Sequence, residues 1–141
     1  MSKKRIVSPE ERFTGVLWGI VAQVKEYQLC WHLNKTLGFD LKRGEDVEVS
    51  NRKKNKTSFF SFYRYSGDLD KWEVFVVGNK HFGEFLVPEV KQTDFFLMIR
   101  GEVSEKQEAE LFGKLKSIPV MQLVVKIDYD RLKSRENLIL E

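Results

Sequence analysis

The longest apolar stretch of the chain, residues 16–22, is the feature that most limits the folds available to it. It lies within segment 13–22, whose β-branched, aromatic and glycine residues are typical of a strand covered on both faces. A membrane-spanning helix needs about 20 apolar residues. This stretch contains Gly19 and is followed at once by Gln23, so it predicts an inner strand of a sheet.

Two segments have the periodicity of amphipathic helices. Residues 23–37 place their apolar positions on one arc of a helical wheel, and Gly38 follows as a left-handed cap. The second helix begins after Ser104, which pairs with Gln107 as a capping box, and ends before Pro119. The first arc consists of Tyr27, Leu29, Cys30, Trp31, Leu33, Asn34 and Leu37, and the second helix is predicted to bury Leu111, Phe112, Leu115 and Ile118.

The other periodic segments predict strands with short connections between them. In the last strand, Leu123 and Val125 are expected on a covered face with Met121 and Ile127. Short links between consecutive strands favour antiparallel pairing. We therefore expect an α+β fold in the order β-α-β-β-β-(β)-β-α-β, with a mainly antiparallel sheet of about six strands and two helices packed on one face. Residues 1–141 form one domain in which 1–12 and 129–141 can be loose tails; the further strands are 47–49, 57–65, 72–77, 84–87, 94–100 and 120–127.

Charge and cysteine content indicate the environment of the protein. The chain of 141 residues is 42% hydrophobic, which is enough for one core. Its formal net charge of +3 is mild and predicts solubility more than a particular partner. The single cysteine, Cys30, favours a reducing compartment. Because Ser8 and Pro9 stand where a secretion signal would be apolar, we expect a cytoplasmic protein without membrane attachment.

Two segments carry a resemblance to a known family. Val87-Pro-Glu-Val-Lys-Gln-Thr-Asp-Phe95 resembles the signature of the IPExxxVDY family of uncharacterised bacterial proteins, with Val, Thr and Phe in place of the Ile, Val and Tyr of that name. Tyr27-Gln-Leu-Cys-Trp-His-Leu-Asn34 is similar to the first helix of that family. The resemblance covers nearly the whole chain and implies a fold without implying an activity.

The polar residues of this motif have a structural and a functional interpretation. Pro88 lacks an amide donor and so ends strand pairing, while Glu89 and Asp94 can accept hydrogen bonds from loop or helix-end amides. The alternative makes the two carboxylates an acid/base or cation-binding pair. We favour the structural role, since no His, Cys or glycine-rich segment lies near them in sequence.

Asn34 is a polar residue within the apolar arc of the first helix. An unpaired buried amide costs about 1–3 kcal/mol, so Asn34 is expected to find partners. It can tie the helix end to a neighbouring segment, for which the one containing Glu89 is a candidate. The alternative is a polar group at the base of a pocket for a small ligand or substrate.

No set of residues with a recognisable catalytic, cofactor-binding or metal-binding pattern occurs in the sequence. Cys30 and His32 lie two apart on a helix, which directs their side chains about 200° from each other. Together with His81 they match no zinc spacing. Phosphate-binding glycine loops and a nucleophile elbow are absent as well. We expect no cofactor, and we favour a non-catalytic protein over an enzyme.

A basic run is the clearest indication of a binding partner. Arg52, Lys53, Lys54 and Lys56 precede the aromatic segment 59–65, and cations beside aromatic side chains are typical of single-stranded RNA binding. The ordinary alternative is a solvated hairpin tip followed by a core strand, which we favour over RNA. The sequence thus predicts a non-catalytic interaction domain with a protein partner. Two alternatives stay open: an RNA- or ribosome-associated module that uses residues 52–56, and a small-ligand binder or enzyme with a pocket near Asn34.

Overall fold

The structure is a computed structural model that describes residues 13–67 and 72–139. It contains two α-helices, ten strands and three short 3-10 helices among these residues. Residues 1–12 and 140–141 of the predicted tails lie outside the described residues. The elements are β1 (Gly15–Val21), α1 (Glu26–Leu37), β2 (Lys42–Arg43), β3 (Val47–Asn51), β4 (Lys56–Phe60), β5 (Phe62–Ser66), β6 (Glu73–Gly78), β7 (Lys80–His81), β8 (Glu84–Phe85), η1 (Pro88–Val90), β9 (Phe95–Arg100), α2 (Glu105–Ser117), β10 (Leu123–Lys126), η2 (Tyr129–Arg131) and η3 (Arg135–Leu138).

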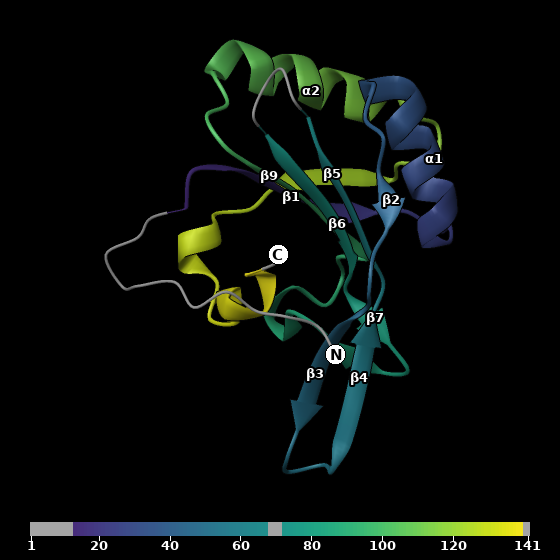
Figure 1. The fold of residues 1–141 in the computed structure, drawn as a ribbon, viewed down its shortest axis with the longest axis vertical. Coiled ribbons are helices and arrows are strands. Elements are labelled where there is room, and N and C mark those ends of the chain that lie inside the picture. Colours follow the sequence, from purple (N-terminus) through teal and green to yellow (C-terminus); the bar gives the residue numbers. More distant parts are fainter. Residues whose placement is uncertain (1–12, 68–71, 140–141) are drawn as a thin grey trace.

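A six-stranded antiparallel sheet forms the centre of the fold, in the order β10-β1-β9-β6-β5-β2. Both helices lie over one face of it (Figure 1), where Trp18 of β1 and Leu97 of β9 pack with Leu29 and Leu33 of α1 and Leu115 of α2. This confirms the predicted α+β class with two helices on one face. Ser104 caps α2 through its hydroxyl, which accepts from the amide of Gln107, as its sequence predicts.

The second face of the sheet is also covered. Phe75 and Phe96 of the sheet pack there with Leu86, and Leu132 and Leu138 from the C-terminal segment complete this core. Segment 129–141 is expected to form one helical turn and a loose tail, and its described part, 129–139, forms η2 and η3. Leu138 is only 1% exposed, so burial of apolar side chains holds this segment on the sheet.

The aromatic segment 57–65, predicted as one strand, is divided at Ser61 into β4 and β5. β5 pairs with β6 in the main sheet, whereas β4 leaves the sheet and pairs only with β3. The resulting hairpin projects at the end of the molecule opposite α2 (Figure 1). The carbonyl of Ser61 accepts from the amide of Gly78, which holds the division point against the end of β6.

Two predicted faces differ from the structure. In α1, Tyr27 and Trp31 were placed on the buried arc but are 57% and 56% exposed. The predicted arc spans about 200° of the helical wheel, and contact with the sheet and α2 covers only the part with Leu29, Cys30 and Leu33.

In β10 the predicted faces are reversed. Val124 and Lys126 pair with Ile20 and Trp18 on the helix face, so Leu123 and Val125 point to the other face and are 50% and 45% exposed. Lys126 reaches the edge of α2 and contacts Glu108 at 3.0 Å. An ion pair with α2 thus replaces the apolar contact that alternation alone predicts.

Candidate interaction surface

The turn of the β3–β4 hairpin carries the predicted basic residues Arg52, Lys53, Lys54 and Lys56, all of them exposed. Arg52, Lys53 and Lys56 form no ion pair with any residue that the structure describes. A concentration of positive charge of this kind attracts anions.

A second hairpin, β7–β8, presents an aromatic side chain. His81 pairs with Glu84, so Phe82 and Gly83 form a two-residue turn in which both φ angles are positive, 44° and 80°. Turns of this geometry favour Asn, Asp or Gly at the first position, because a bulky side chain is disfavoured at positive φ. Phe82 nevertheless occupies it and is 90% exposed.

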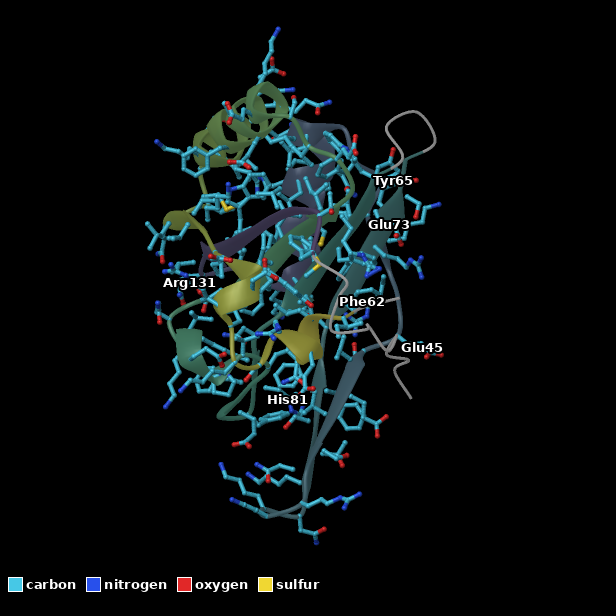
Figure 2. The ribbon with its side chains drawn as sticks, turned by 90° about the vertical axis from the view of Figure 1, so that its left-hand side faces the viewer. Glu45, Phe62, Tyr65, Glu73, His81 and Arg131 are labelled. Carbon is cyan, nitrogen blue, oxygen red and sulfur yellow. The ribbon has the colours of Figure 1, made fainter. Side chains whose placement is uncertain are left out.

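The two hairpins are joined by specific contacts. The Lys54 ammonium lies 3.2 Å from a carboxylate oxygen of Glu84, and the amide of Phe59 donates to Nδ1 of His81 at 3.4 Å. The His81 ring contacts the Phe82 ring edge-on, with centroids 4.7 Å apart, and lies 6.1 Å from that of Phe59. Figure 2 shows His81 above the hairpin turn, where side chains ending in nitrogen gather. Cations and aromatic rings are therefore adjacent at this end.

A cleft of about 530 Å³ lies between the hairpins and the C-terminal segment. Arg52 and Lys53 line one side, Gly83 and Lys91 another, and Asn137 contributes a polar side chain. Its size is within the range of ligand sites. We call this cleft, with the basic turn and the rings of Phe59, His81 and Phe82, the hairpin surface.

Asn79, which the sequence does not mark as a site residue, holds the base of the β7–β8 hairpin in place. Its side chain is completely buried. Oδ1 accepts from the amide of Val87 at 2.8 Å, while Nδ2 donates to the carbonyls of Val90 and Thr93 at 3.1 and 2.9 Å. Motif residues 87–93 thus fold around one amide group. The pair Gly78-Asn79 has the composition of an ordinary turn, which explains why the sequence did not reveal it.

The motif carboxylates contact two different parts of the chain. Oδ2 of Asp94 accepts from the amide of Ala22 at 3.0 Å, and its Oδ1 lies 2.6 Å from the ammonium of Lys80. Oε2 of Glu89 accepts from the amide of Ser134 at 2.7 Å. Within the described structure Asp94 thus holds β1 and β7, and Glu89 holds the segment that begins at Ser134. Pro88 is the first residue of η1.

Hydrogen bonding lowers the pKa of Glu89. Partial burial acts to raise the pKa of this carboxyl, but the amide of Ser134 and neighbouring backbone amides stabilise the charged form and outweigh that effect. A lowered folded-state pKa contributes stability that is present above the unfolded-state pKa and is lost as the pH falls through the folded-state value.

Replacement of Glu89 by glutamine tests this contribution. We expect Glu89→Gln to lower the Tm by about 1–3 °C near neutral pH, a small effect because the side chain is exposed. The difference should shrink as the pH falls through the lowered folded-state pKa of Glu89, because the native carboxylate becomes protonated there. Thermal unfolding followed by circular dichroism measures both values. A difference that stays constant with pH would show that the charge of Glu89 has no role.

Asn34 contacts the segment that follows its own helix. Its Oδ1 accepts from the amide of Leu41 at 2.8 Å, and its Nδ2 donates to the Leu41 carbonyl at 3.3 Å. The segment with Glu89, considered as its partner, is not involved. Asn34 does not line the hairpin cleft, the cleft at the start of α1 or the cleft beside β10.

The residues considered for catalysis are separated by the fold. Cys30 is buried between α1 and the sheet, where burial and the charge of Glu26 raise the pKa of its thiol to about 12. His32 packs against Trp31, and His81 lies on the hairpin surface. Within residues 13–67 and 72–139 no group of three or more His, Cys, Asp or Glu side chains is placed to hold a metal ion.

Most of the aromatic residues expected beside the basic run are part of the core. Phe60 and Phe62 are buried, and Tyr63 and Tyr65 pack against the helix-face core. Phe59 remains 45% exposed on β4. The exposed aromatic group that the sequence did not single out is Phe82, for which the signal is a glycine directly after it between two short strands.

No family model, no curated protein and no solved structure matches this chain. The resemblance of segment 87–95 to the IPExxxVDY family therefore stays a hypothesis. Among the described helices none has the length and apolar content needed to cross a membrane.

Proposed function

We propose that this protein is a non-catalytic binding domain that contacts an anionic partner through the hairpin surface. The observation that supports the proposal is the placement of Arg52, Lys53 and Lys56 at the tip of a hairpin that leaves the main sheet. A hairpin that served only to connect strands would not need to project. The single cysteine of the chain, which is buried, favours a cytoplasmic location.

The buried interior supports binding rather than catalysis. Both faces of the sheet are covered by apolar side chains. Three polar side chains make hydrogen bonds to backbone groups and so hold segments of the chain together: those of Asn79, Asp94 and Asn34. Charged groups available to a partner are concentrated on the surface. Electrostatic contacts at an exposed, positively charged site give fast and salt-dependent association.

Charge reversal at the hairpin tests the proposal. We expect the variant Arg52→Glu, Lys53→Glu, Lys56→Glu to elute from immobilised heparin at much lower salt than the wild type, because the polyanion loses its local contacts. The control is Lys106→Glu, Lys114→Glu, Lys116→Glu on α2, at the far end of the molecule (Figure 1), which has the same formal net charge.

The control should remain bound at higher salt than the hairpin variant. Equal elution of the two variants would contradict the proposal, since it would show that net charge rather than the hairpin surface determines binding.

A further inference from the structure

We infer that the anionic partner is single-stranded RNA, whose bases stack on Phe82 and Phe59 while its phosphates contact Arg52, Lys53 and Lys56. This inference rests on the proposed function and adds the partner to it. It also gives a function to the exposed ring of Phe82.

Phe82 has two unfavourable features at once. Its ring is 90% exposed, although burial of a Phe side chain is worth about 1.5–3 kcal/mol. Its φ of 44° is a conformation that bulky residues avoid, and strain of this kind is concentrated at functional sites. Asn or Gly would satisfy the turn better. A ring held outward at such a position is suited to stack on a flat group of a partner.

His81 makes Phe82 part of a larger aromatic surface. Its ring lies edge-on to that of Phe82, at 77° between the planes, and edge-on to that of Phe59, at 81°. The amide of Phe59 donates a hydrogen bond to Nδ1 of His81. Phe82, which is 90% exposed, and Phe59, which is 45% exposed, thus both lie edge-on to the His81 ring. Aromatic platforms of this kind bind bases with little dependence on sequence.

Positive charge lies next to these rings. The Lys54–Glu84 contact brings the basic turn against β8, two residues beyond Phe82, and the cleft between them is lined by Arg52, Lys53 and Lys91. In nucleic-acid recognition, phosphate contacts position the strand and contacts to the bases add to them. The hairpin surface offers both.

The single-stranded form follows from the need for stacking. Bases in a duplex are already stacked on each other, so a protruding phenyl ring can reach them only where they are unpaired. Unpaired segments are the usual targets in RNA recognition. An acidic protein segment would satisfy the cations but would leave Phe82 without a flat partner.

Oligouridine binding measured by fluorescence anisotropy tests the inference. The decisive variant is Phe82→Asn, because Asn suits the turn. We expect its Tm to be equal to or above that of the wild type, while its affinity for oligouridine falls about 5- to 100-fold. An abasic oligomer of the same length should bind the wild type and Phe82→Asn equally. Tyr27→Asn, which removes an exposed ring from α1, is the control and should keep wild-type affinity.

Two other results separate failure of the inference from failure of the proposed function. If Phe82→Asn binds oligouridine as the wild type does, or if poly-glutamate or duplex RNA binds as tightly as oligouridine, the RNA inference is overturned. The proposed function then stands as long as charge reversal at the hairpin weakens binding to all these polyanions. If charge reversal at the hairpin does not weaken binding to any of these polyanions, both the RNA inference and the proposed function are wrong.

Discussion

Replacement of Asn79 by alanine is expected to lower the free energy of unfolding by about 3–5 kcal/mol. The side chain is 0% exposed and makes three hydrogen bonds to the backbone of residues 87–93. Without it the amide of Val87 and the carbonyl of Thr93 lose their partners in the interior. The carbonyl of Val90 keeps the hydrogen bond from the Thr93 amide. Each unsatisfied buried group costs about 1–3 kcal/mol.

Urea denaturation measures this loss, and Asn51→Ala is the matched control. Asn51 lies on the exposed hairpin, where its Oδ1 accepts one hydrogen bond from the amide of Lys54 at 3.3 Å. Its replacement should cost less than about 1 kcal/mol. A loss at Asn79 no greater than the loss at Asn51 would show that the motif does not depend on this amide.

A similar loss, about 3–5 kcal/mol, is expected for Trp18→Ala. Trp18 is 1% exposed, stands in an inner strand opposite Leu97 of β9, and fills the space beneath the helices. Removal of the indole leaves a cavity between two layers that cannot close without moving the helices. Because domains of this size are stable by about 5–15 kcal/mol, the variant should unfold at far lower urea.

Trp31→Ala provides the comparison within the same chain. Trp31 is 56% exposed and contacts His32 and the ammonium of Lys35 on the surface of α1. We expect a change of less than about 1 kcal/mol. Equal losses at the two tryptophans would mean that α1 presents the face with Trp31 to the sheet, as the helical wheel alone suggested.

The sequence predicts the longer elements of this fold because they have local signals, whereas it does not predict the two-residue strands β2 and β7. The capping box at Ser104, the glycine after α1 and the unbroken apolar segment of β1 act through neighbours in the chain. The buried face of each helix or strand is less predictable, since it depends on which other elements pack against it. Trp31 and Leu123 are apolar at positions that periodicity assigns to the core, yet no other element covers them and both are exposed.

The candidate site is predictable only in part for the same reason. The cations at 52–56 are contiguous in the sequence and could be recognised there. The roles of Phe82 and Asn79 depend on tertiary structure. A tight turn exposes Phe82, and the loop of residues 87–93 buries Asn79. A turn with Phe before Gly departs from the usual Asn-Gly pattern, so its hairpin is hard to identify from composition.

The central claim, that the hairpin surface is the binding surface, is tested most directly by amide chemical-shift mapping of the isotope-labelled protein during titration with oligouridine. We predict that the changes are confined to β3, β4, β7, β8 and the turns between them, with the amides of Phe82 and Gly83 among the most affected. Changes centred on the exposed rings of α1 or on the β10 edge, or none at all, would contradict the account.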